Sequence, residues 1–217
     1  MKKIRLDIYH TASMDVDPQM GFSELCPSEL PVPGALEIAN ELNKQASFGR
    51  IRCASKDAHP SNGIWIATPT APQFSLVAEP NVDIRWNRHC QVGTVGMNFL
   101  PGLPEPLVYN FIAYKGIEFN SHPYGACFAD LKGTRSTGLI EFLKVNKIDN
   151  VILGGLALNF CVGTTAYQLK DAGFKVIVNL AATRGIEVTP GACAEYINKL
   201  KNSGINVIEN LDSIISR

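Results

Sequence analysis

The chain has 217 residues, of which 46% are hydrophobic and 18% are charged, and its mean hydropathy is +0.04. These values are typical of an ordinary globular protein and exclude a disordered, fibrous or membrane-embedded chain. Twenty Lys and Arg residues balance twenty Asp and Glu residues, so no overall positive charge is available to attract a polyphosphate, and nucleic acid is not expected as a partner. We expect a single domain that spans residues 1–217.

Six cysteines are spread evenly along the chain, without a C-x-x-C pair or a dense cluster. This spacing is typical of free thiols in a reducing compartment and not of a disulfide framework or a zinc ribbon. The N-terminal sequence lacks the unbroken apolar stretch of a signal peptide, and no window approaches ~18 apolar residues. We therefore expect a cytoplasmic protein that does not interact with a membrane.

Apolar runs alternate with helical spacings along the chain. The expected strands cover residues 11–16, 48–54, 107–114, 150–155, 175–180 and 204–208, and the expected helices begin at Pro33-Gly34 and cover residues 136–146, 161–172 and 190–202. A long stretch rich in Pro, Asn and Gly lies between Ser55 and Pro106, and segments of this kind are often functional. The alternation predicts a Rossmann-like three-layer α/β/α fold, with a central parallel sheet between helices.

Residues whose side chains can act in catalysis or bind a metal follow the expected strands. They are Asp17, Asp57, His59, Lys115 and Cys161. Ligands of parallel sheets bind at the carboxyl ends of the strands, so these residues are expected at one edge of the sheet. Taken alone, Asp17 is compatible with a turn and Lys115 with a surface position, but their joint occurrence favours a functional site.

The segment Asp57-Ala58-His59 has the pattern of a metal site. In an extended segment the first and third side chains point the same way, and a carboxylate with an imidazole suits Zn²⁺, Fe²⁺ or Mn²⁺. His89 could supply a third ligand, although any of the four histidines could do so. A polar loop without a metal is the alternative interpretation.

Cys161 lies at the start of an expected helix that follows a glycine-terminated strand. The helix dipole and the free backbone N–H groups at this position would lower the pKa of the thiol and favour a thiolate nucleophile. The same N–H groups could hold an oxyanion. The alternative interpretation is a small buried hydrophobic residue.

The order of these residues and their local sequences resemble the isochorismatase-like cysteine hydrolases, most closely the nicotinamidase branch of that family. The matching segments are residues 16–22, 30–35, 55–60, 86–94, 115–116 and 155–162. The resemblance implies a hydrolase that converts nicotinamide to nicotinate and ammonia through a cysteine thioester, in NAD salvage. Two alternatives stay open: a relative that acts on another small amide or ureido substrate, and a non-catalytic binding protein. The chain could also form a homo-oligomer, which the sequence does not decide.

The resemblance also implies roles for individual residues. The catalytic triad would be Asp17, Lys115 and Cys161. The backbone N–H groups of Ala157 and Cys161 would form the oxyanion hole, with a cis peptide bond before Ala157.

The remaining implied roles concern the metal and the substrate. One divalent ion, zinc or else iron or manganese, would be bound by Asp57, His59 and His89, and would bind the pyridine nitrogen of nicotinamide. Phe22 and Trp86 would form aromatic walls of the pocket.

Several positions depart from the family pattern. Gly21 replaces an acidic residue, and the first strand contains Ser13 and Asp15 where apolar residues are usual. Residues 61–65 offer no fourth metal ligand, and residues 124–128 replace the usual S-A-F segment. These departures bear on metal affinity and on the specificity of the pocket.

Overall fold

The computed structural model describes residues 3–216 and is built around a six-stranded sheet in the order β6-β3-β2-β7-β8-β9. Every neighbouring pair of these strands is parallel. The strands are β2 (Thr11–Val16), β3 (Ile51–Asp57), β6 (Phe111–Lys115), β7 (Asn150–Leu156), β8 (Lys175–Arg184) and β9 (Asn206–Ile208). The two central strands, β2 and β7, are buried along their whole length, as expected for parallel strands covered on both faces.

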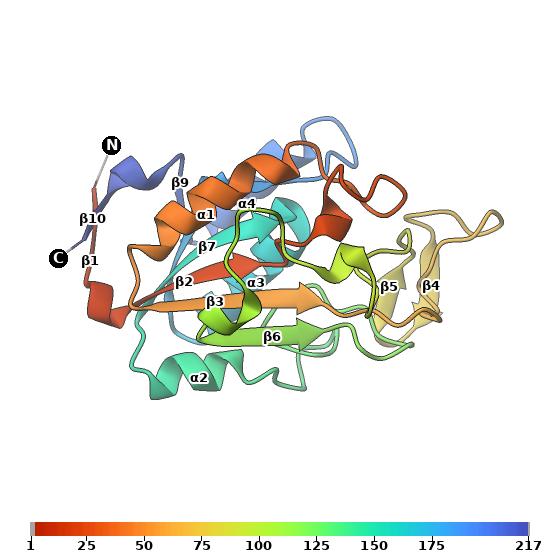
Figure 1. Cartoon of the computed structure of the whole chain (residues 1–217), viewed down its shortest axis with the longest axis horizontal. Helices are drawn as coiled ribbons and strands as arrows, with labels where there is room; N and C mark the ends of the chain where they lie inside the picture. Colours follow the sequence, from red (N-terminus) through yellow and green to blue (C-terminus); the bar gives the residue numbers. More distant parts are fainter. Residues whose placement is uncertain (1–2, 217) are drawn as a thin grey trace.

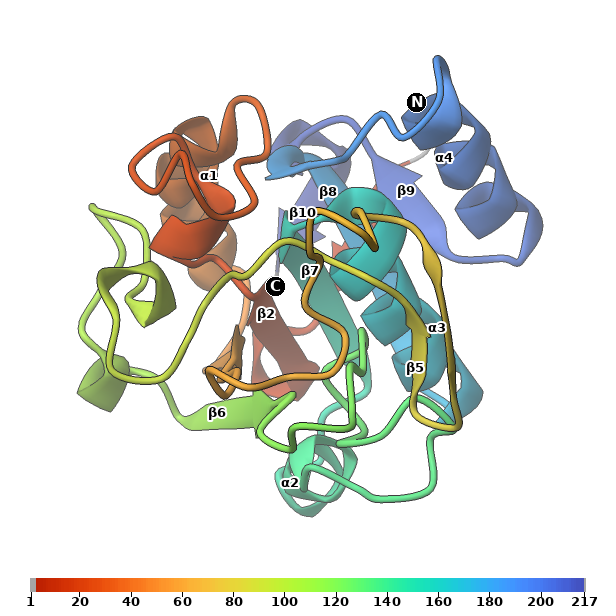
Figure 2. The ribbon, with the colours of Figure 1, turned by 90° about the vertical axis from the view of Figure 1, so that its right-hand side faces the viewer.

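Helices cover both faces of the sheet (Figures 1 and 2). The helix α1 (Ile38–Ala46) packs on one face, and α2 (Leu139–Val145), α3 (Gly163–Asp171) and α4 (Ala192–Asn202) pack on the other. Each face has its own apolar core, one beneath α2, α3 and α4 and one beneath α1. This arrangement confirms the predicted three-layer α/β/α fold. None of the helices within residues 3–216 has the length and apolar composition that a membrane span needs.

Two small sheets accompany the central one. The strands β1 (Ile4–Leu6) and β10 (Ile214–Ser216) pair in parallel at the left edge of the molecule in Figure 1. The strands β4 (Leu76–Glu79) and β5 (Val82–Ile84) form an antiparallel hairpin within the long segment between β3 and β6. This segment crosses the carboxyl ends of the sheet strands, which face the viewer in Figure 2.

Some element boundaries differ from the prediction. The strand expected from residue 107 begins at Phe111, because Pro106–Val108 forms a short 3₁₀ turn in which Leu107 is 98% exposed. The helix expected from Cys161 begins only at Gly163, after a π-helical turn over Leu158–Val162. The apolar residues that suggested earlier starts therefore lie outside the regular elements.

The unusual polar residues of β2 have partners inside the protein. Ser13 Oγ accepts a hydrogen bond of 3.1 Å from Gln45 Nε2 of α1. Asp15 Oδ2 accepts bonds from Arg52 Nε at 2.9 Å and Nη2 at 2.7 Å, and from the Tyr109 hydroxyl at 3.0 Å. Asp15 Oδ1 has no hydrogen-bond partner within the described part of the chain. Burial raises the pKa of Asp15 to about 6, although the Arg52 guanidinium opposes the shift.

The raised pKa of Asp15 predicts a pH-dependent stability. A carboxyl whose pKa is higher in the folded state binds its proton more tightly there, so stability is lost as the pH rises from about 4 to about 6. Each pKa unit corresponds to about 1.4 kcal/mol, which gives a loss of about 3 kcal/mol. We expect the free energy of unfolding of Asp15→Asn to rise by this amount relative to the parent between pH 4 and pH 7, measured by urea denaturation. A pH-independent difference between the two proteins would contradict this assignment.

Candidate active site

The carboxyl ends of four strands bring the predicted residues together. Asp17 follows β2, Asp57 ends β3, Lys115 ends β6, and Cys161 lies in the turn after β7. The parallel register of β3 and β6 places Asp57 directly opposite Lys115. All four side chains are buried, so their charges interact without screening by bulk water.

Lys115 lies at the centre of this group. Its Nζ is 3.0 Å from Asp17 Oδ2 and 3.7 Å from Cys161 Sγ, and it donates a short hydrogen bond to Asp57 Oδ1. Burial alone would lower the pKa of Lys115, but the Asp17 and Asp57 carboxylates raise it well above its usual value. The lysine therefore stays charged and neutralises part of the negative charge around it.

Asp17 is held in a fixed position by Ser55. The Ser55 hydroxyl donates to Asp17 Oδ1 at 2.6 Å and accepts from the Asp17 backbone N–H at 3.2 Å. Asp17 has a φ of 44°, in the left-handed region, where Asp and Asn are among the better tolerated residues. These contacts leave Asp17 Oδ2 to face Lys115 and the thiol.

The thiol of Cys161 does not have the lowered pKa that its position in the sequence suggested. Burial raises the pKa well above the usual range, and the carboxylates of Asp17 and Asp57 add to the increase, whereas Lys115 opposes it. The resting form is therefore the thiol. A nucleophile of this kind needs an adjacent proton acceptor. A carboxylate oxygen of Asp17 lies within 4.8 Å of Cys161 Sγ, and Asp17 is not one of the predicted metal ligands.

The turn before Cys161 has a specific backbone geometry. The peptide bond between Leu156 and Ala157 is cis, as the resemblance implies. Gly155 has a φ of 123°, and a Cβ atom there would overlap the backbone of Val16. Because only glycine avoids this overlap, β7 can approach β2 closely at the edge of the site.

The predicted metal ligands also converge. Asp57 Oδ2 is 3.5 Å from His59 Nε2 and 3.8 Å from His89 Nε2. His59 Nδ1 lies 3.0 Å from the Gly116 carbonyl oxygen, and His89 Nδ1 lies 2.6 Å from that of Asn87. A backbone carbonyl at Nδ1 fixes the proton on that nitrogen and leaves the Nε2 lone pair for a metal. Asp57 thus contacts Lys115 through one oxygen and the imidazoles through the other.

The donor set fits a divalent cation. Ligand atoms around a tetrahedral zinc ion lie about 3.3 Å apart when each is about 2.0 Å from the metal, close to the separations from Asp57 Oδ2. His59 Nε2 is buried and has no hydrogen-bond partner among residues 3–216. Burial lowers the pKa of His89 to about 3, so this imidazole is neutral, as a metal ligand must be.

A third imidazole, His122, was missed by the sequence analysis. His59, His89 and His122 each place one ring nitrogen in this site, and these three nitrogens lie within 4.8 Å of one another. His122 comes from the loop after β6, at no characteristic spacing from the other two, and only the small number of histidines in the chain hinted at it. The fourth histidine, His10, lies outside this group and contacts the Lys147 carbonyl oxygen.

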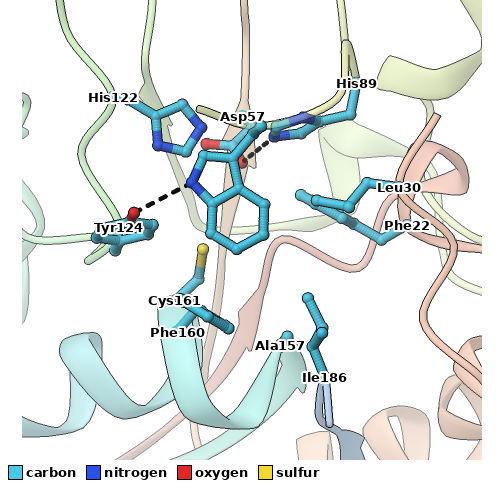
Figure 3. A pocket seen from close by; sticks show the side chains of 11 residues that line it. Phe22, Leu30, Asp57, His89, His122, Tyr124, Ala157, Phe160, Cys161 and Ile186 are labelled. Carbon is cyan, nitrogen blue, oxygen red and sulfur yellow. Dashed lines mark hydrogen bonds and ion pairs between the residues drawn. The ribbon is translucent and has the colours of Figure 1, made fainter. Parts of the chain in front are cut away.

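An aromatic pocket of about 280 Å³ opens onto these groups (Figure 3). Its lining includes Phe22 and Trp86, which the resemblance implied, together with Tyr124, Phe160 and Cys161. The Trp86 Nε1–H donates to the Tyr124 hydroxyl at 3.1 Å, so the replacement of the S-A-F segment supplies a partner for the indole. The largely aromatic and apolar lining suits a flat ring.

Glu29 occupies the place of the acidic residue that Gly21 lacks. A Cβ atom on Gly21 would overlap the Glu29 carboxylate. Glu29 Oε2 accepts a hydrogen bond of 2.8 Å from the backbone N–H of Cys90, the residue after His89. An acid from a different part of the loop therefore supports the His89 segment.

We expect Glu29→Ala to lower the free energy of unfolding by about 1–3 kcal/mol, because the Cys90 N–H loses its acceptor. Urea denaturation would measure this loss. Gly21→Asp alone should also destabilise the protein, but it should cost less in the Glu29→Ala background, where the competing carboxylate is gone. Additive effects of the two substitutions would show that Glu29 does not fill the position of the missing acid.

The chain belongs to the isochorismatase family, because the sequence profile of the Isochorismatase domain matches residues 16–209. The nicotinamidase of Acinetobacter baylyi is 29% identical over 203 residues, which cover 92% of each chain. The resemblance inferred from the sequence motifs is thus confirmed at the level of the family.

Solved structures agree with this assignment. A nicotinamidase and pyrazinamidase of Acinetobacter baumannii superimposes with a TM-score of 0.85 at 29% identity, covering 94% of this chain and 98% of that one. The yeast nicotinamidase bound to nicotinaldehyde gives 0.81 at 26% identity, covering 92% and 100%. A pyrazinamidase of Pyrococcus horikoshii in complex with zinc gives 0.72 at 26% identity, covering 92% and 98%.

Proposed function

We propose that the chain is a nicotinamidase, which hydrolyses nicotinamide to nicotinate and ammonia and serves in NAD salvage. The observation that carries this proposal is the buried group of Asp17, Lys115 and Cys161 at the base of a small aromatic pocket. The relatives with the same fold act on nicotinamide or bind its analogue nicotinaldehyde. A flat aromatic ring with a carboxamide matches both the walls and the reactive end of the pocket.

The residues of the site can carry out both halves of the reaction. Asp17 accepts the proton of the Cys161 thiol, and the sulfur attacks the carboxamide carbon to form a tetrahedral intermediate. The backbone N–H groups of Ala157 and Cys161 stabilise the oxyanion. Asp17 returns its proton to the amino group, and ammonia leaves a thioester. Asp17 then takes a proton from water, which attacks the thioester, so that nicotinate is released and the thiol is restored.

Lys115 acts on this chemistry through its charge. Its ammonium group lies 3.0 Å from Asp17 and 3.7 Å from Cys161, so it stabilises the thiolate as the proton moves to Asp17. The hydrogen bond to Asp57 fixes the lysine between the proton acceptor and the metal ligands. Lys115 thereby contacts both the proton acceptor Asp17 and the metal ligand Asp57.

Asp57, His59 and His89 are proposed to bind one divalent ion, with zinc supported by the zinc-bound pyrazinamidase neighbour. When bound, this ion would act as a Lewis acid, and the ring nitrogen of the substrate could bind to it, which would anchor the substrate. The side chains of Phe22 and Trp86 line the cavity between these ligands and the thiol. They are proposed to restrict the ring to orientations in which the carboxamide reaches Cys161.

An ammonia-release assay tests the proposed function. The metal-loaded and the chelated protein would each be given nicotinamide, benzamide, a ureido compound and an aliphatic amide. We expect hydrolysis of nicotinamide by the loaded protein, a raised KM after chelation, and weaker activity on benzamide, which lacks the ring nitrogen. A preference for the ureido or aliphatic compound would contradict the substrate, and no hydrolysis of any amide would contradict the enzyme class.

A further inference from the structure

We propose that His122 is a protein ligand of the metal and replaces the fourth ligand that residues 61–65 do not supply. This inference builds on the metal site of the proposed function. It assigns a role to a residue that lies outside every motif of the sequence analysis.

The first observation is the convergence of the three imidazoles. The His122 ring stacks on that of His59, with centroids 5.0 Å apart and planes inclined by 14°, and meets that of His89 edge-on at 5.6 Å. Figure 3 shows His122 beside Asp57 and across from His89, at the top of the pocket. The three rings therefore converge on one small volume, and Asp57 contacts two of them, His59 and His89.

The second observation is that His122 is buried without a hydrogen-bond partner. Neither Nδ1 nor Nε2 has a partner within residues 3–216, and the residue is only 3% exposed. A buried polar atom left unpaired costs about 1–3 kcal/mol. A bond from one nitrogen to a metal removes this cost for that nitrogen, and the residue lines the pocket in which the metal ligands Asp57 and His89 also lie.

The loop after Asp57-Ala58-His59 contains no histidine or carboxylate for this role in residues 60–65. It directs Trp65 into the site, where the indole lies 4.4 Å from the His59 ring and 4.7 Å from the His122 ring between centroids. An indole N–H is a hydrogen-bond donor only and cannot bind a cation through nitrogen. Trp65 thus fills the space on this side, and the ligand comes from the loop after β6.

The backbone around His122 is fixed at both sides. The His122 N–H donates to the Asn81 carbonyl oxygen at 2.9 Å, which ties it to the β4–β5 hairpin. The Pro123 carbonyl oxygen lies 3.4 Å from Lys115 Nζ. A ligand on a loop held in this way is preorganised, so little conformational freedom is lost when the metal binds.

Two measurements without turnover test this assignment. X-ray absorption of the zinc-loaded parent should count three imidazole ligands, and a count of two would overturn the proposal even if variants failed to fold. In competition with a chelator, His122→Ala should bind Zn²⁺ at least about 100-fold more weakly than the parent, since loss of even an outer partner of a ligand costs about 10–100-fold.

His10→Ala is the matched control, because the His10 ring contacts the Lys147 carbonyl oxygen and Asp149, far from the pocket lining. It should bind zinc like the parent. An affinity of His122→Ala within threefold of the parent would overturn the proposal. Since neither measurement uses nicotinamide, a failed ligand assignment is distinguished from a failed proposed function, which the ammonia-release assay decides separately.

Discussion

Replacing Cys161 with alanine should lower kcat for nicotinamide by at least about 10⁴-fold, because no other thiol of residues 3–216 lines the pocket and loss of a nucleophile removes the covalent route. The fold should be retained, since only a small sulfur atom is removed from a turn after β7. Zinc content should also be unchanged, because the proposed ligands are Asp57 and the imidazoles. The measurements are steady-state kinetics, zinc content and thermal unfolding.

Cys127→Ala provides the matched control. Cys127 is buried like the candidate nucleophile and packs in the same apolar core beneath α2, α3 and α4, but it is not among the residues that line the pocket. Its replacement should lower stability through the cavity that it leaves and should leave kcat nearly unchanged. If Cys161→Ala retained kcat within tenfold of the parent, Cys161 would not be the nucleophile.

The architecture was predictable because alternating apolar runs and helical spacings determine a parallel α/β sheet. The strand β2 was placed at both of its ends, and β7 within one residue. The boundaries that were wrong depend on tertiary packing: Leu107 extends an apolar run in the sequence but is exposed in a turn. The β4–β5 hairpin was missed because its two strands have only four and three residues and are mostly exposed, which leaves too short a pattern to predict them.

The candidate site was predictable where a residue follows a strand. Asp17, Lys115 and Cys161 lie in contact because parallel strands end at one edge. His122 and Glu29 were missed because each acts from a loop whose path is set by contacts distant in sequence, with Asn81 and Cys90 respectively. The predicted decrease in the pKa of Cys161 was wrong, since a helix start in the sequence reveals neither the complete burial of the thiol, which raises its pKa most, nor the Asp17 and Asp57 carboxylates nearby.

Asp17→Asn should lower kcat for nicotinamide by about 10²–10⁴-fold, the usual contribution of a general acid or base. The substitution is nearly isosteric, Asn tolerates the left-handed backbone at this position, and its side-chain oxygen can still accept from Ser55. The Cys161 thiol has a raised pKa and cannot ionise readily by itself, so loss of the proton acceptor should place the effect toward the upper end of this range. Steady-state kinetics at pH 7 would measure it.

The reactivity of the thiol separates proton transfer from a merely structural role for Asp17. The Asp17 carboxylate contributes to the raised pKa of Cys161, so its neutralisation lowers that pKa and increases the thiolate fraction at pH 7. Alkylation of Cys161 by iodoacetamide should therefore become faster in Asp17→Asn while amide hydrolysis becomes slower. Asp15→Asn neutralises a buried carboxylate in β2, the strand before Asp17, at a position that does not line the pocket. It should change neither rate by more than about threefold. A parallel decrease of alkylation and turnover in Asp17→Asn would indicate a disrupted site, and Asp17 would lose its role as the proton acceptor.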